Sequence, residues 1–145
     1  MALCCMVLIF LLSSQVSTAS NSLSLSVTSS IQKVYSMVLP DANFTISNHD
    51  IRKLAHFVVF AVLGFLFANA FIKSNINVYR SLTYSGVLIV IYSIGDELQQ
   101  RFVPGRGPGI SDVLIDIVGG FFGMLCYLIL LGLFTSIEKN KLKMR

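Results

Sequence analysis

The most informative part of this sequence is the stretch DELQQRFVPGRGPGISD (residues 96–112). It holds five charged side chains and two glutamines, and it lies between two almost uncharged apolar segments, Ser81–Gly95 and Val113–Phe134. Charged groups beside or inside a bilayer cost free energy unless they are paired or hydrated, so such a cluster is a candidate functional site. An ordinary polar loop between two membrane helices would have a similar composition, and only the order of the residues separates the two interpretations.

The composition of the rest of the chain is that of an integral membrane protein. Of the 145 residues, 54% are hydrophobic and 12% are charged. A soluble domain of this length needs a polar surface, which 11 basic and 7 acidic residues gathered at segment ends would not supply. We therefore expect an all-α fold, an integral membrane four-helix bundle with a polar cluster on one membrane face, in a single domain over residues 1–145.

Four apolar segments are expected to cross the membrane. They are residues 1–16, 54–72, 78–95 and 113–134, and residues 96–112 form the polar loop between the last two. At about 1.5 Å per residue, the 19 residues from Leu54 to Ile72 can cross a hydrocarbon core of about 30 Å. The first segment leaves two alternatives open. A cleaved signal peptide is one, because Ser17-Thr18-Ala19 resembles a signal-peptidase site. A retained membrane anchor is the other, because a signal peptide has basic residues before its apolar run and this segment has none. The true start codon could also lie further upstream and lengthen this helix.

Basic residues favour a cytoplasmic C-terminus by a narrow margin. With four spans both termini lie on one side, and that side carries Lys73, Arg80 and the four basic residues of 139–145, six in all. The other side carries the remaining five of the 11 basic residues. Positive residues concentrate on the cytoplasmic side, so we expect a cell-membrane protein with extracytoplasmic polar loops.

Ionisable side chains at the ends of the predicted spans recur at three- and four-residue steps, which place them on one face of a helix. They are His49, Arg52, Lys53 and His56, then Asp96 with Gln100, Glu97 with Arg101, and Asp112 with Asp116. In any four-span arrangement these segments lie on the same side, so we expect one polar pocket. Its candidate ligand-binding residues are Lys53, His56, Asp96, Glu97, Gln100, Arg106, Asp112 and Asp116.

The roles of these residues leave alternatives open. His56 can hydrogen-bond Asp96 or Asp112 across the bundle, or it can act on a ligand. Arg106 is the best partner for Asp116, because a guanidinium group can bind a carboxylate or a phosphate through two hydrogen bonds. The Gly- and Pro-rich residues 104–109 could form an anion-binding nest or simply a tight surface turn. Catalytic residues are unknown, and we expect no metal and no cofactor.

Small residues recur at four-residue steps inside two of the predicted spans. Gly64 and Ala68 form one such pair, and Gly119 and Gly123 form another. This spacing lets helix backbones approach closely, so we expect these residues to pack helices of the same chain against each other.

The chain resembles the VanZ-like family of small bacterial membrane proteins, which is named after an accessory teicoplanin-resistance protein. The resemblance rests on IFLLSSQ (residues 9–15), KLAHF (53–57), DELQQRFVPGR (96–106) and SDVLID (111–116) followed by Gly119 and Gly120. The last two motifs are specific: DE-x-x-Q, then PGR, then an aspartate six residues after the arginine. Many relatives have asparagine where this chain has Asp116. The resemblance implies that the first span is retained.

Two functions follow from the motifs and the resemblance. The first is an envelope protein that binds a phosphate-bearing membrane lipid or lipid-linked wall precursor through Arg106, Lys53 and the carboxylates, and so lowers susceptibility to teicoplanin-type glycopeptides. The alternative is a membrane-embedded hydrolase or transferase acting on a lipid-linked substrate through Glu97, His56 and Arg106, or with a metal that His49 helps to bind. A transporter has only Asp116 in its favour. Nucleic-acid binding is not expected, because the basic tail has no accompanying aromatic or groove-entering element.

Overall fold

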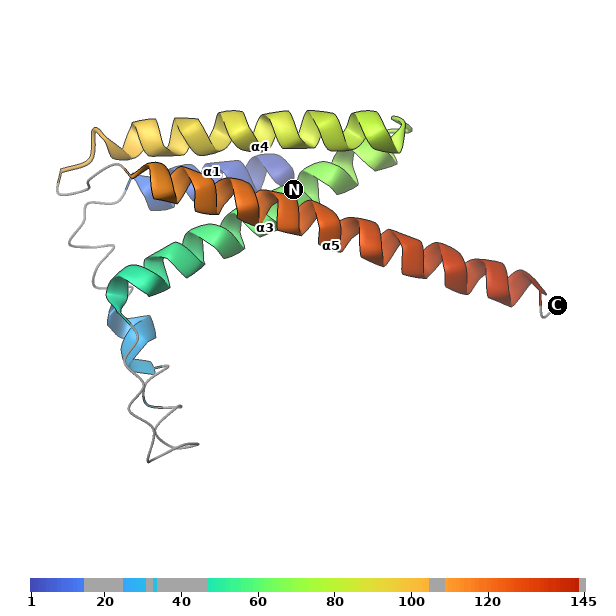
Figure 1. Cartoon of the computed structure of the whole chain (residues 1–145), viewed down its shortest axis with the longest axis horizontal. Coiled ribbons are helices and arrows are strands. Elements are labelled where there is room, and N and C mark those ends of the chain that lie inside the picture. The colour runs from blue at the N-terminus through green and yellow to red at the C-terminus, as the bar shows by residue number, and fades with distance from the viewer. Residues whose placement is uncertain (15–24, 31–32, 34–46, 105–108, 144–145) are drawn as a thin grey trace.

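The computed structural model describes residues 1–14, 25–30, 33, 47–104 and 109–143 (Figure 1). The long elements are α1 (Ala2–Ser13), α3 (Asn48–Lys73), α4 (Val78–Gln100) and α5 (Ile110–Lys143). Residues 25–30 are helical as well, and the described residues include no strand. The prediction of an all-α fold is confirmed.

The helices on either side of the predicted polar loop extend into it. Helices occupy both ends of the predicted loop 96–112. Asp96 to Gln100 belong to α4, in agreement with the helical spacing of these two residues, and Ile110 to Asp112 begin α5. Gln100 Nε2 donates a hydrogen bond to Asp96 Oδ2 at 2.8 Å, so these two side chains pair along one helical face. The helix ends just before Arg101, three residues ahead of Pro104, which cannot continue it.

Two helices of the described chain are long and apolar enough to cross a membrane, over residues His49–Lys73 and Ile110–Ile137. They contain the predicted spans 54–72 and 113–134 and extend beyond them. Helix α4 contains the predicted span 78–95 and then continues into its polar end. Helix α1 has 12 residues, about 18 Å at 1.5 Å each, and residues 15–24 beyond it lie outside the described part of the chain.

Helices α3 and α5 cross at a seam made by glycines. A Cβ atom on Gly64 would overlap the carbonyl oxygen of Gly120, and one on Gly123 would overlap the carbonyl oxygen of Ala61. Only hydrogen side chains allow the two backbones to approach this closely. The predicted packing role of Gly64 and Gly123 is therefore confirmed.

Helices α1 and α4 complete the packing around α3. The core cluster joins Ile9 of α1, Ile89 of α4 and the α3 residues Phe60, Leu63 and Phe67. The hydroxyl of Tyr92 on α4 donates to the carbonyl oxygen of Met6 at 2.5 Å. Helix α1 thus contributes both apolar and polar contacts to the fold.

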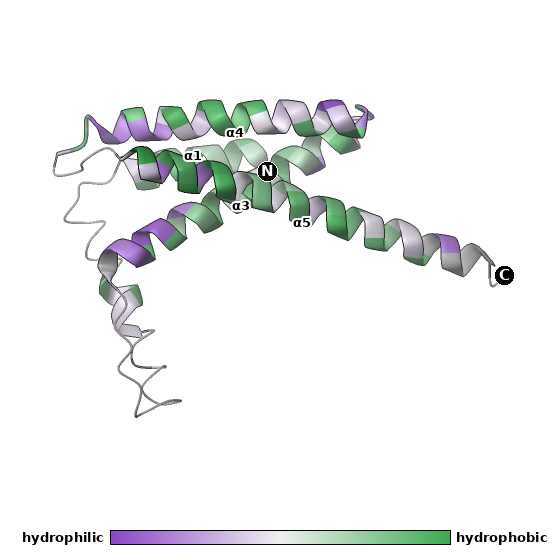
Figure 2. Cartoon of the chain, viewed as in Figure 1, coloured by the Kyte–Doolittle hydropathy of each residue, from purple (hydrophilic) through white to green (hydrophobic). Residues whose placement is uncertain are grey.

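The polar ends of three helices gather at one end of the molecule. The start of α3, the end of α4 and the start of α5 lie together on the left of Figure 1, and hydrophilic residues concentrate at this end of α3 and α4 in Figure 2. The end of α1 reaches the same place, because Gln99 Nε2 of α4 donates to the carbonyl oxygen of Phe10 at 3.1 Å. The segment before residue 54 and the described helical parts of residues 96–112 therefore lie at one end of the molecule.

Candidate functional site

A buried polar cluster lies where α3, α4 and α5 meet at this end. His56 Nδ1 lies 3.1 Å from Asp116 Oδ1 and 4.0 Å from Asp96 Oδ2. Asp116 is 0% exposed and Asp96 is 4% exposed. Gln100 donates a hydrogen bond to the carboxylate of Asp96. Each of the three helices therefore supplies at least one member of what we call the His–Asp cluster, defined as His56, Asp96 and Asp116.

The glycine seam explains why these residues meet. His56 lies two turns into α3, and its neighbour Phe57 presents a carbonyl oxygen that a Cβ on Gly119 would overlap. Gly119 follows Asp116 by less than one turn of α5, so the close approach of the backbones brings the carboxylate level with the imidazole. The fold of α3 on α5 thus fixes the position of the ion pair.

Two further carboxylates lie beside the cluster and have other partners. Asp112 is in the first turn of α5, where a negative charge is favoured by the helix dipole, and its Oδ2 lies 3.9 Å from the guanidinium of Arg52. Glu97 accepts a hydrogen bond at Oε1 from the backbone amide of Gly109. The amide of Gly109, one of those expected in an anion-binding nest, therefore binds a carboxylate of the protein itself.

Three buried carboxylate oxygens have no hydrogen-bond partner among the described residues. They are Asp96 Oδ1, Glu97 Oε2 and Asp116 Oδ2. Native proteins leave very few buried polar atoms unsatisfied, because each costs about 1–3 kcal/mol or more when charged. Three such atoms at one place are the strongest structural indication of a ligand site in this chain.

The structure places most of the predicted site residues together. His56, Asp96, Gln100 and Asp116 are in direct contact, and Glu97 and Asp112 lie on the same helix turns. Lys53 is half-buried on α3 and has no ion pair or hydrogen bond within the described residues, whereas Arg106 lies outside them. Of the two partners expected for His56, Asp96 lies 4.0 Å from its Nδ1, but the hydrogen bond is made with Asp116, which was not expected as a partner.

Three contacts at this end of the molecule were not predicted from the sequence. Arg52 pairs with Asp112, Gly109 donates to Glu97, and Ser93 Oγ donates to the carbonyl oxygen of Val113 at 3.0 Å. The signal for Arg52 was present, since it precedes His56 by four residues and shares its helix face. No local signal identifies Ser93, whose partner is 20 residues away.

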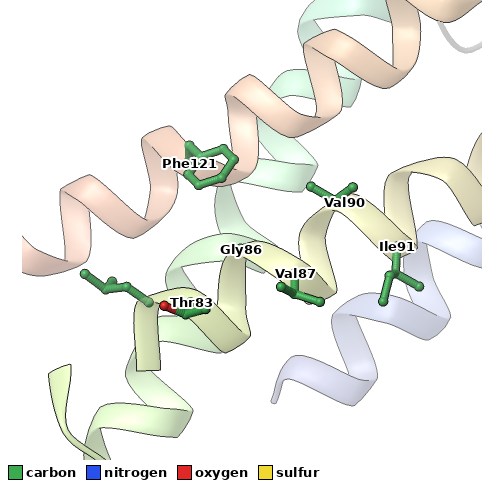
Figure 3. A pocket seen from close by; sticks show the side chains of 7 residues that line it. Thr83, Gly86, Val87, Val90, Ile91 and Phe121 are labelled. Carbon is green, nitrogen blue, oxygen red and sulfur yellow. The ribbon is translucent and has the colours of Figure 1, made fainter. Parts of the chain in front are cut away.

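An open apolar groove lies along α4 beside α5, apart from the His–Asp cluster (Figure 3). Its lining consists of Leu82, Thr83, Gly86, Val87, Val90, Ile91 and Phe121. The hydroxyl of Thr83 is the one polar side-chain group on these walls, so the groove provides no group for acid, base or metal chemistry. The chemistry of the chain is concentrated at the polar helix ends.

The site is rich in acceptors and poor in donors. The four carboxylates of Asp96, Glu97, Asp112 and Asp116 face one imidazole and the guanidinium of Arg52, which is 26% exposed at the rim. Carboxylates accept hydrogen bonds from hydroxyl, amide and ammonium groups and bind cations, and they repel phosphate. A phosphate group could therefore approach only the basic rim of this site or a cation held within it.

Comparison with known proteins gives one family. The family model described as VanZ/LLP1 matches residues 1–131, which include α1, α3, α4 and the part of α5 that carries the site. No curated protein and no solved structure shows a significant match to the chain.

Proposed function

Because the chain belongs to the VanZ/LLP1 family, we propose that it is a multi-pass membrane protein in which α1, α3, α4 and α5 form a four-helix bundle. The two long apolar helices support this arrangement, as do the contacts of α1 and α4 with α3. Outward-facing apolar residues support it too. Leu54, Val58 and Val62 on α3, and Leu114, Val118 and Leu125 on α5, are all about half exposed. Apolar surface of this extent is unusual on a soluble monomer and suits contact with lipid.

The orientation that we propose follows from the basic residues. The C-terminal tail with Lys139 and Arg145 lies in the cytoplasm, and the polar helix ends face the outside of the cell membrane. In this arrangement the site is open to components of the cell envelope.

We propose that the polar site binds the headgroup region of a phosphate-bearing lipid or lipid-linked wall precursor. The observation that carries this proposal is the set of three buried carboxylate oxygens that have no hydrogen-bond partner within the described part of the chain. Ionisable groups inside membrane proteins are expensive to bury, and a chain that needed only packing would not gain from them. A ligand with hydroxyl, amide or ammonium donors would satisfy these oxygens.

The phosphate of such a ligand would lie at the rim of the site. Arg52 and Lys53 begin the rim on α3, and Arg106 follows the end of α4 in the sequence. A guanidinium binds phosphate bidentately, whereas an ammonium acts as a point charge. By holding a wall precursor in this way, the protein would lower the susceptibility of the cell to teicoplanin-type glycopeptides.

The experiment that tests this function is the teicoplanin inhibitory concentration of a susceptible Gram-positive host. We expect wild type to raise it, and Arg106→Ala and Asp112→Ala to lose the increase at equal membrane abundance. Asp50→Ala is the matched control, because Asp50 is an exposed carboxylate near the same end of α3 and should keep the increase. If the Arg106→Ala/Asp112→Ala double variant retains resistance, the site assignment is wrong. If wild type gives no increase, the proposed resistance role is wrong.

A hydrolase or transferase is the second candidate, and one observation favours it. Asp116 holds Nδ1 of His56, which is how a carboxylate orients a histidine that acts as a general base. Glu97, the other expected acid–base residue, instead accepts a hydrogen bond from the backbone amide of Gly109. Release of inorganic phosphate or pyrophosphate from a lipid-linked substrate by wild type, lost in His56→Gln, would favour this function over simple binding.

A further inference from the structure

The His–Asp cluster has the dimensions of a metal site. One nitrogen of His56 and one carboxylate oxygen each from Asp96 and Asp116 lie within 4.8 Å of one another. Ligand atoms at about 2.0–2.2 Å from a common cation lie roughly 3–4 Å apart, so small side-chain movements would bring all three onto one ion. The 3.1 Å separation of His56 Nδ1 and Asp116 Oδ1 already has this value.

The unpartnered oxygens provide a second and independent observation. Asp96 Oδ1 and Asp116 Oδ2 are buried without a hydrogen bond from any described residue, on side chains that are only 1% and 0% exposed. Hydrogen bonding within the cluster therefore leaves acceptor capacity on both carboxylates. A cation between them would use this capacity and would also compensate two negative charges that His56 alone cannot neutralise.

We propose that His56, Asp96 and Asp116 bind a divalent transition-metal cation, with Zn²⁺ as the best match. Imidazole nitrogen with carboxylate oxygens suits zinc and related metals, whereas magnesium and calcium prefer oxygen ligands alone. The neutral imidazole would bind the cation through Nδ1, the ring nitrogen that lies 3.1 Å from Asp116 Oδ1. The sequence-based expectation of no metal is replaced by this proposal.

The surroundings of the cluster fit a metal site with an open position. Gln100 Nε2 donates to Asp96 Oδ2 and so orients that carboxylate, as outer-shell partners of metal ligands do. Three protein ligands leave a fourth position of a tetrahedral zinc ion for water or a ligand. If the lipid function proposed above holds, this position is where a phosphate oxygen could bind despite the acidic surroundings.

The test is direct titration of the purified full-length chain in detergent, stripped of metal, with Zn²⁺ in a calorimeter. We expect saturable binding at one ion per chain, and at least a tenfold weaker affinity in His56→Gln, Asp96→Asn and Asp116→Asn. His49→Gln and Asp50→Asn are matched controls, because both residues are exposed on the first turn of α3 and should keep the wild-type affinity. Cys4→Ser/Cys5→Ser should keep it too, which separates the cluster from the thiols of α1.

Several results would overturn the proposal. They are the lack of one-to-one binding by wild type, a loss of affinity in His49→Gln as large as in His56→Gln, and the loss of binding in the cysteine variant. Gel filtration shows which variants remain folded, and the wild-type titration alone decides the matter if the cluster variants aggregate. Because the titration uses neither lipid nor antibiotic, it can fail while the resistance experiment succeeds, and the converse also holds.

Discussion

Replacing Gly123 with valine should prevent α3 and α5 from packing and should lower the unfolding temperature more than any other single change considered for this chain. A Cβ at this position would overlap the carbonyl oxygen of Ala61, and a backbone atom cannot move aside as a flexible side chain can. Overpacking of this kind costs about 3 kcal/mol or more when the backbone must shift. The measurement is thermal unfolding of the purified protein in detergent, followed by helical circular dichroism.

Gly132→Val is the matched control on the same helix. Nothing lies within 4 Å of a Cβ placed on Gly132, so this substitution should leave the unfolding temperature nearly unchanged. Both variants make the same change of residue type in α5, and only their neighbours differ. Equal unfolding temperatures for the two variants would show that α3 and α5 do not meet at this seam.

Replacing His56 with alanine should produce the second largest loss of stability. The substitution leaves the buried carboxylates of Asp96 and Asp116 without the one imidazole that lies between them. Removal of one partner from a buried hydrogen bond costs about 1–3 kcal/mol, because the remaining group stays desolvated and unpaired. His56→Gln should lose less, since an amide N–H can still donate to Asp116. The measurement is again the unfolding temperature, taken in metal-free buffer.

The control for this prediction is the other histidine of the chain. His49 is exposed on the first turn of α3, so His49→Ala should unfold at the wild-type temperature. A His56→Ala protein as stable as the His49→Ala protein would mean that the imidazole contributes nothing to the buried carboxylates.

Much of this architecture could be predicted from the sequence, because its signals are local. Apolar length identified the segments of α3 and α5, and the four-residue spacing of Asp96 and Gln100 placed them on one helix face, where the structure shows a hydrogen bond between them. The small residues Gly64 and Gly123 were expected to pack helices, and the close approach of α3 and α5 confirms it. Each of these inferences uses only residues of a single segment of the chain.

The pairing inside the site was not predictable in the same way. His56 and Asp116 are 60 positions apart, and their meeting depends on how far α3 slides along α5 before the glycines of the seam interlock. Sequence spacing carries no information about that axial offset, so Asp116 was not expected as a partner of His56, whereas Asp96, which lies 4.0 Å from the imidazole, was. The bounds of the polar loop were set by composition, although Gln100 pairs with Asp96 within α4.

The claim on which the account depends is that residues from separate helices form one buried site, and a double-mutant cycle between His56 and Asp116 tests it most directly. Unfolding free energies would be measured in detergent for wild type, His56→Ala, Asp116→Ala and the double variant. We expect the double variant to lose at least about 1 kcal/mol less than the sum of the single losses, because residues in contact couple by about 0.5–3 kcal/mol. Losses that add to within about 0.5 kcal/mol would contradict the account, since they would mean that these two side chains do not interact.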